Sequence, residues 1–105
     1  MVVDARVDPV EVLKALAEPA RWRIVERLGV EELCVCHLVE DLGVAQPLVS
    51  HHLKVLREAG IVESERFKQW IYYRVRPEVL ADLGRQFTEL AHAAPHASER
   101  RRPCC

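Results

Sequence analysis

The stretch that decides the fold is QPLVSHHLKVLREAG, residues 46–60. In a helix, with about 100° per residue, its polar and apolar side chains separate onto opposite arcs. The polar arc consists of Gln46, Pro47, Ser50, His51, Lys54, Arg57 and Glu58. The apolar arc consists of Leu48, Val49, Leu53, Val55, Leu56 and Ala59. One face therefore packs inward, and the other offers the hydrogen-bonding groups and positive charge that a helix in a DNA major groove must present.

The residues before this stretch predict three shorter helices. Residues 32–42 fit a short helix, and the break at residues 43–45 separates it from the longer one, which is a helix-turn-helix outline. Asp8 and Pro9 predict the start of a first helix that runs to about residue 17. Residues 19–28 predict a second helix that ends at a glycine. His52 lies on the apolar arc of the long helix, so we expect it to be a packing residue.

After Gly60 the pattern changes from helix to strand. Residues 61–66 and 69–75 are rich in β-formers and predict a hairpin that turns at residues 67–68. Arg66 and Lys68 then lie at its tip, with Arg74 beyond, as in a wing that contacts the phosphate backbone or the minor groove. The alternative is a solvated hairpin tip. The expected fold is mainly α with a β-hairpin, a winged helix-turn-helix.

Pro77 predicts the start of a last helix with an apolar stripe, which consists of Leu80, Leu83, Phe87 and Leu90. Such a stripe can be plain core, but a helix-turn-helix protein usually reads two half-sites as a dimer, so we expect a homodimer interface here. We expect residues 1–94 to form one DNA-binding and dimerisation domain. Residues 95–105 are expected to be a flexible C-terminal tail with vicinal cysteines, Cys104 and Cys105.

Charge is unevenly distributed along the 105 residues, although the net charge is −1. Residues 1–45 hold five basic and nine acidic side chains, whereas residues 46–76 hold six basic and three acidic ones. A local basic excess is what a phosphate-contacting surface requires. The sequence has no apolar run of about 18 residues and no signal-peptide pattern, so we expect a cytoplasmic protein without a membrane partner.

In a reducing compartment, cysteines are more often metal ligands or reactive thiols than members of structural disulfides. A buried cysteine can also act simply as a small hydrophobic residue. Cys34 and Cys36 offer soft thiolates, which select thiophilic ions. Residues two apart lie about 200° around a helix, so we expect that one ion cannot bridge both while this turn is helical. Binding of an ion is then expected to unwind the start of the short helix and to shift the long helix in the groove.

Cys104 and Cys105 could supply a third ligand, form a second site or do nothing. His37 is a borderline zinc ligand, and more often such a residue is simply exposed.

Four segments together closely resemble the ArsR/SmtB family of metal-responsive repressors: ELCVCHL at 32–38, QPLVSHHL at 46–53, LREAGIV at 56–62 and WIYYR at 70–74. The resemblance covers about residues 9–92, and the Cys-Val-Cys sequence points to the arsenic-responsive branch. It implies a homodimer that occupies an inverted-repeat operator in double-stranded DNA, blocks transcription of detoxification genes, and is released by trivalent arsenic or antimony. Where those proteins often carry a third cysteine, this chain has Val39.

Two alternatives remain open at this point. A sensor for Cd²⁺, Pb²⁺ or Zn²⁺ would use Cys34, Cys36 and the tail thiols; zinc sensors of this family carry ligands on the last helix, which here offers Asp82 and His92 without the usual spacing. A thiol redox-sensing regulator or a small reductase would use the paired thiols. Because a reductase needs a nucleophile pocket and a βαβ unit, which the sequence does not show, we do not expect an enzyme.

Overall fold

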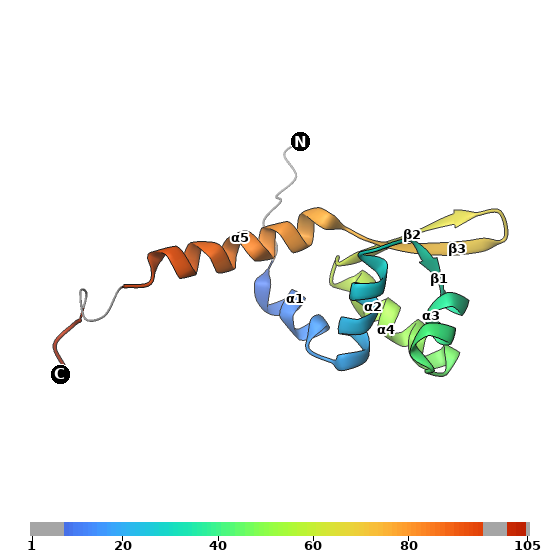
Figure 1. Cartoon of the computed structure of the whole chain (residues 1–105), viewed down its shortest axis with the longest axis horizontal. Helices are drawn as coiled ribbons and strands as arrows, with labels where there is room; N and C mark the ends of the chain where they lie inside the picture. Colours follow the sequence, from blue (N-terminus) through green and yellow to red (C-terminus); the bar gives the residue numbers. More distant parts are fainter. Residues whose placement is uncertain (1–7, 96–100, 105) are drawn as a thin grey trace.

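The computed structural model describes residues 8–95 and 101–104. In these residues a body of helices carries a small antiparallel sheet at one end, and a last helix leaves the body at the other (Figure 1). The elements are α1 (Pro9–Leu16), α2 (Pro19–Leu28), β1 (Leu33–Cys34), α3 (Val35–Leu42), α4 (Gln46–Glu58), β2 (Val62–Phe67), β3 (Trp70–Val75) and α5 (Pro77–Ala93). The predicted winged helix-turn-helix fold is confirmed.

Capping residues set the helix boundaries. The Asp8 carboxylate accepts a hydrogen bond from the backbone N–H of Val10 at 3.0 Å, and Pro9 follows at the first helical position. Glu18 caps α2 in the same way by accepting from the backbone N–H of Arg21. Gly43 ends α3 with a φ of 65°, a left-handed conformation that a side chain disfavours. These caps fix where α1 and α2 begin and where α3 ends.

The core lies between α1, α2, α3 and α4 and the inner face of the sheet. Its fully buried side chains are Val12, Ile24, Leu38, Val49, Leu53, Leu56, Ile61 and Val62. The apolar arc of α4 is therefore inward, as predicted, with one exception. Leu48 lies on that arc but is 48% exposed. It lies in the first turn of α4, next to the fully buried Val49.

The sheet has the order β1-β3-β2. Strands β2 and β3 form the predicted hairpin, but the turn consists of Lys68 and Gln69, one residue later than the sequence suggested. Lys68 adopts a φ of 57°, which allows this two-residue turn. Strand β1 was not predicted: Leu33 pairs with Tyr73, and Cys34 pairs with Tyr72. The wing is thus anchored on the segment that leads into α3.

Helix α5 begins at Pro77, as predicted, and projects away from the body on the side opposite the wing (Figure 1). Its apolar stripe divides into two parts. Leu83 is buried and Leu80 packs against the chain's own core, whereas Phe87 is 51% exposed and Leu90 is 70% exposed. Leu83 therefore belongs to the core of this chain. Among the described residues, no helix combines the length and the apolar composition needed to cross a bilayer.

Candidate thiol site and DNA-binding face

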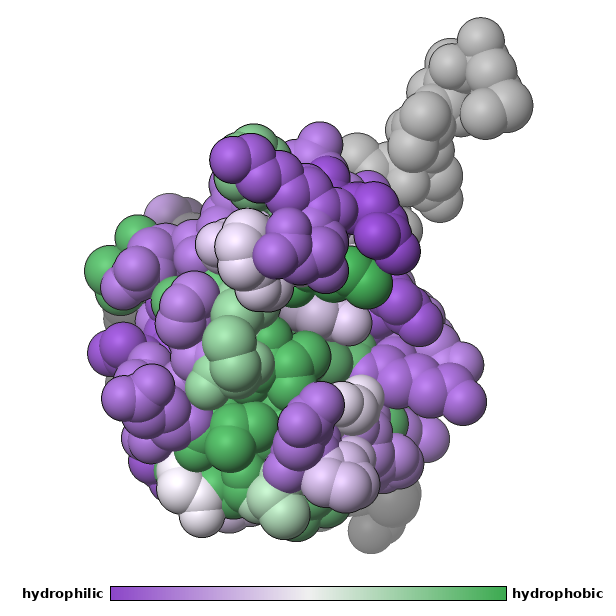
Figure 2. Space-filling model, turned by 90° about the vertical axis from the view of Figure 1, so that its right-hand side faces the viewer, coloured by the Kyte–Doolittle hydropathy of each residue, from purple (hydrophilic) through white to green (hydrophobic). Residues whose placement is uncertain are grey.

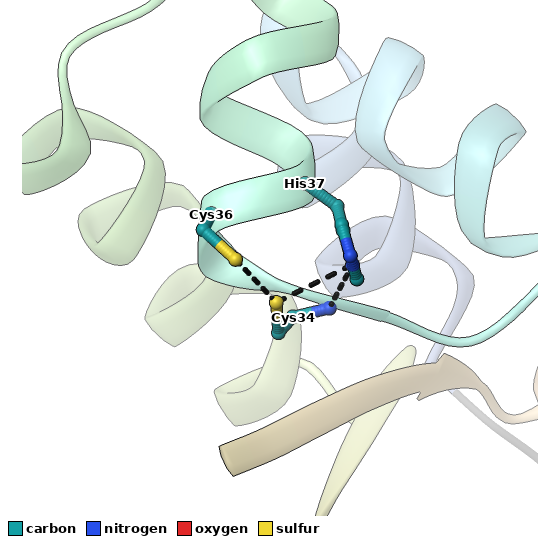
Figure 3. Close-up of side chains that lie close together, drawn as sticks. All are labelled: Cys34, Cys36 and His37. Carbon is teal, nitrogen blue, oxygen red and sulfur yellow. Dashed lines mark hydrogen bonds between the residues drawn. The ribbon is translucent and has the colours of Figure 1, made fainter.

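The thiols of Cys34 and Cys36 meet at the junction of β1 and α3 (Figure 3). Cys34 is the N-cap residue of α3 and is extended, with φ −92° and ψ 170°, while Cys36 lies in the first turn. Because the cap residue stands outside the helix, the two sulfurs lie 2.7 Å apart. The expectation that one ion could not reach both sulfurs without unwinding the helix is therefore wrong: the 200° separation applies only when both residues are helical.

His37 closes the third side of this cluster. The backbone N–H of Cys34 donates to His37 Nδ1 at 3.2 Å, and the same nitrogen lies 3.3 Å from Cys34 Sγ. One donor atom from each of Cys34, Cys36 and His37 lies within 4.8 Å of the others. His37 is exposed, as expected for a helix residue, but its ring turns back to cap α3. Its position three residues after the N-cap is the signal that sequence reasoning missed.

The two thiols differ in their surroundings. Cys34 is buried and Cys36 is exposed. Burial opposes ionisation of Cys34, but hydrogen bonds from the Cys36 thiol and from the His37 backbone leave its pKa below the ordinary value. The hydrogen bond to Cys34 raises the pKa of Cys36. Cys34 therefore has the lower pKa of the two thiols, and one hydrogen bond joins the two sulfurs.

Among the residues that the structure describes, the other predicted ligands do not join this cluster. Cys104 is exposed and is absent from the group that Cys34, Cys36 and His37 form, while Cys105 lies outside the described residues. On α5, the buried carboxylate of Asp82 accepts hydrogen bonds from Arg85 and Gln86. Asp82 is thus engaged within its own helix. His92 lies exposed in the last turn of α5.

Helix α4 presents its predicted polar arc to solvent. The exposed residues of this arc are Gln46, Pro47, Ser50, His51, Lys54, Arg57 and Glu58. Neither Lys54 nor Arg57 forms an ion pair with a described carboxylate, so both positive charges are available to a ligand. This face has the shape and the charge for the major groove.

His52 fixes the opposite face of α4, as the packing prediction required. It is buried, and its Nδ1 lies 3.2 Å from Arg21 Nη1, while its Nε2 lies 3.7 Å from the Glu18 carboxylate. Arg21 also donates to the carbonyl of Ala15 at 2.6 Å. Burial lowers the pKa of His52, which favours the neutral ring. The network joins α4 to α2.

The hairpin tip carries exposed Arg66 and Lys68, as predicted. Arg74, in contrast, is held by Glu63 at 2.9 Å and by Glu65 at 3.0 Å, and these carboxylates raise its pKa. Arg74 therefore serves the hairpin and is not free for phosphate. Sequence reasoning also missed the apolar side chains that the wing exposes, Phe67, Trp70 and Ile71. Seen from the wing end, the molecule shows apolar surface framed by hydrophilic side chains (Figure 2).

Both the sequence and the fold of this chain are similar to those of known proteins. Residues 18–64 match the family model described as bacterial regulatory protein, arsR family. The chain is 49% identical over 72 residues to the arsenic resistance transcriptional regulator ArsR1 of Pseudomonas putida, covering 68% of this chain and 56% of that protein. The chain belongs to the ArsR family. The matched residues of this ArsR-family chain include both the thiol cluster and the whole of α4.

Two further relatives fit the same assignment. The ArsR-family chain is 43% identical over 89 residues to the HTH-type transcriptional repressor SmtB of Mycobacterium tuberculosis, covering 85% of this chain and 62% of that protein. The structure of an ArsR-like transcriptional regulator from Rhodococcus superposes with a TM-score of 0.74 at 27% identity, covering 80% of this chain and 79% of that one. The chain thus spans less than two thirds of the length of the Pseudomonas putida ArsR1 and Mycobacterium tuberculosis SmtB proteins. Family and fold are those of DNA-binding transcriptional regulators.

Proposed function

We propose that this protein is a homodimeric transcriptional repressor that binds an inverted-repeat operator and is released by trivalent arsenic or antimony at Cys34 and Cys36. The observation that carries the proposal is the contact between the two sulfurs, 2.7 Å, at the start of the helix that leads into α4. The similarity to an arsenic resistance regulator supports the choice of inducer. We expect the protein to work in the cytoplasm, where its DNA is.

The donor set fits a soft, thiophilic ion. Two thiolates bind such ions in preference to Mg²⁺ or Ca²⁺, which take oxygen ligands. Cys36 is open to solvent, so an incoming ion can reach it first, and Cys34 stands directly behind it. The described residues supply no third thiol here, so a tail cysteine, solvent or a free thiol would complete a three-coordinate site.

The DNA side of the proposal uses α4 and the wing. Gln46, Pro47, Ser50 and His51 would contact base edges in the major groove, and Lys54 and Arg57 would contact phosphates. Arg66 and Lys68 would contact phosphate from the wing. Release follows if the thiol-bound state fits DNA less well, and the coupling is reciprocal, so DNA must weaken inducer binding by the same factor.

The dimer in this proposal uses the outer half of α5. Leu83 is buried within its own subunit and Leu80 is largely used there, so the surface left to a second copy centres on Phe87 and Leu90. Large apolar side chains left in water favour association, because burying them removes apolar area from solvent. A two-fold dimer would place two α4 helices for two half-sites.

The test uses an operator that the apoprotein itself selects from a pool of random double-stranded DNA. We expect arsenite and antimonite to release the parent protein, and we expect Cys34→Ser and Cys36→Ser to keep DNA binding but to lose release, because serine keeps the shape and removes the soft ligand. Cys104→Ser with Cys105→Ser is the matched control on the tail. Release of Cys34→Ser at the parent's arsenite concentration would show that the site is elsewhere.

A second candidate is a repressor released by Cd²⁺, Pb²⁺ or Zn²⁺. The observation that favours it is His37 Nδ1, 3.3 Å from the Cys34 sulfur, because imidazole nitrogen and thiolate together suit zinc. Acidic side chains also line the adjoining cleft, among them Glu32 and Glu40, and would attract a cation. In the same release assay, His37→Asn would impair the response to these cations and spare the response to arsenite.

A further inference from the structure

One face of the wing sheet joins the thiol site to the hairpin tip. Residues paired across strands share a face, and so do residues two apart along a strand. Cys34 and Glu65 both pair with Tyr72, and Phe67 pairs with Trp70, so all five lie on one face. The opposite face carries the core residues, among them Leu33 and Val62. The thiol site is thus on the outer surface of the sheet that forms the wing.

Contacts between side chains on this face are continuous. The His37 ring lies 6.3 Å from the Tyr72 ring, centroid to centroid, and the Tyr72 ring lies 6.3 Å from the Phe67 ring at an interplanar angle of 71°. Edge-to-face geometry at this distance is the favourable arrangement for aromatic pairs. Phe67 is in turn the cross-strand partner of Trp70 next to the turn. Tyr72 is therefore in contact with the thiol site on one side and with the wing tip on the other.

This arrangement gives the thiol site a route to the wing that does not pass through α4. The sulfurs of Cys34 and Cys36 are in contact at 2.7 Å, closer than two ligands of one ion lie. Cys36 is held in the helix, whereas Cys34 belongs to a strand of only two residues. Cys34 pairs with Tyr72, so a movement of Cys34 would act on Tyr72.

We propose that Tyr72 is the positioning residue that transmits occupancy of the thiol site to the wing. The inference rests on the proposed function, because it takes arsenite as the ligand of Cys34 and Cys36. When those thiols are occupied, β1 and the His37 ring shift against Tyr72, and the Phe67 and Trp70 side chains at the wing tip take a new arrangement. The wing then no longer fits the phosphate backbone that it meets in the free state.

The chain contains its own reporter for this step. Trp22 and Trp70 are its only tryptophans, and Trp22 lies exposed on α2. In a Trp22→Phe background, emission therefore reports Trp70 alone and needs no DNA. We expect arsenite to change this emission, with its midpoint at the arsenite concentration that blocks half of the Cys34 and Cys36 thiols. Cys34→Ser should abolish the change in emission.

Substitutions on β3 test the role of Tyr72 itself. Tyr72→Phe keeps the ring and should keep the arsenite-induced change in Trp70 emission. Tyr72→Ala should lose this change. In Tyr72→Ala, the arsenite concentration that blocks half of the Cys34 and Cys36 thiols should differ from the parent's by less than about threefold. The ratio of operator affinities without and with arsenite, typically about 5 to 150 in coupled systems, should fall toward 1 in Tyr72→Ala. Ile71→Ala, the matched control on the opposite face of β3, should behave as the parent.

Three results would overturn the inference. A Trp70 emission that stays constant while arsenite blocks the thiols would mean that occupancy does not reach the wing. A full emission change in Tyr72→Ala would mean that another route carries it. If Tyr72→Ala proves unfolded by circular dichroism, Phe67→Ala replaces it, since Phe67 is exposed and a retained full response would refute the contact path. Thiols left unblocked at saturating arsenite would refute the proposed function and the inference with it.

Discussion

Replacing Arg66 with alanine removes one exposed positive charge from the wing of each subunit. Lys54, Arg57, Arg66 and Lys68 are exposed cations that no described carboxylate neutralises, so a dimer would bring eight charges to the phosphates. Each contact contributes about 0.9 to the slope of log affinity against log salt concentration, so the parent slope should be about −7 and the Arg66→Ala slope about −5.4. Between 0.1 and 0.2 M salt, affinity should then fall about 150-fold for the parent and about 40-fold for the variant.

The assay is operator binding by fluorescence anisotropy over a series of salt concentrations, with the operator selected by the apoprotein. Arg23→Ala is the matched control, because it removes an exposed arginine from α2, outside the proposed DNA-binding face. Its slope should equal that of the parent. An Arg66→Ala slope equal to the parent slope would show that the wing does not touch phosphate, whatever the change in absolute affinity.

Three further predictions concern other parts of the molecule. Ser50→Ala and His51→Ala should each reduce discrimination between operator and random DNA by about 1–3 kcal/mol per lost base contact; unchanged discrimination in both would exclude the α4 assignment. The apoprotein should sediment as a dimer at micromolar concentration, and Phe87→Glu with Leu90→Glu should make it a monomer; a monomeric parent would count against the interface. Burial lowers the pKa of His52, so the unfolded chain binds the proton more readily, and stability should fall as pH drops through about 6.5. The urea midpoint should therefore decrease between pH 7.5 and 5.5, and His52→Gln should flatten this dependence; an unchanged slope would refute the assignment.

The helical part of the fold could be predicted because its signals are periodic and local. The arcs of residues 46–60, the cap at Asp8, the helix start at Pro19 and the glycine at position 43 each follow from helix geometry. Leu48 was misplaced because an angular position says on which side a residue lies, not whether a neighbouring element reaches it. The stripe that contains Leu83 left two alternatives open, core or interface, because a stripe does not reveal which of its turns the chain covers itself; Leu83 is buried within the chain.

The geometry of the thiol site could not be predicted, because it depends on a strand too short to give a pattern. Strand β1 has two residues, and only its pairing with Tyr72 and Tyr73 defines it. That pairing holds Cys34 in an extended conformation outside α3 and brings its sulfur to Cys36. The two candidate thiols were thus accessible from residue type and spacing, whereas their convergence depended on a contact between residues nearly forty positions apart.

Strand β2 forms the outer edge of the wing sheet, with β3 on one side and no described strand on the other. An open edge offers unpaired N–H and C=O groups on which another chain can add a strand, especially where apolar side chains such as Phe67 are exposed. Glu63, Glu65 and Arg66 place charge along this edge and make such addition unfavourable. The two carboxylates that hold Arg74 in place therefore also protect the protein against aggregation through its wing.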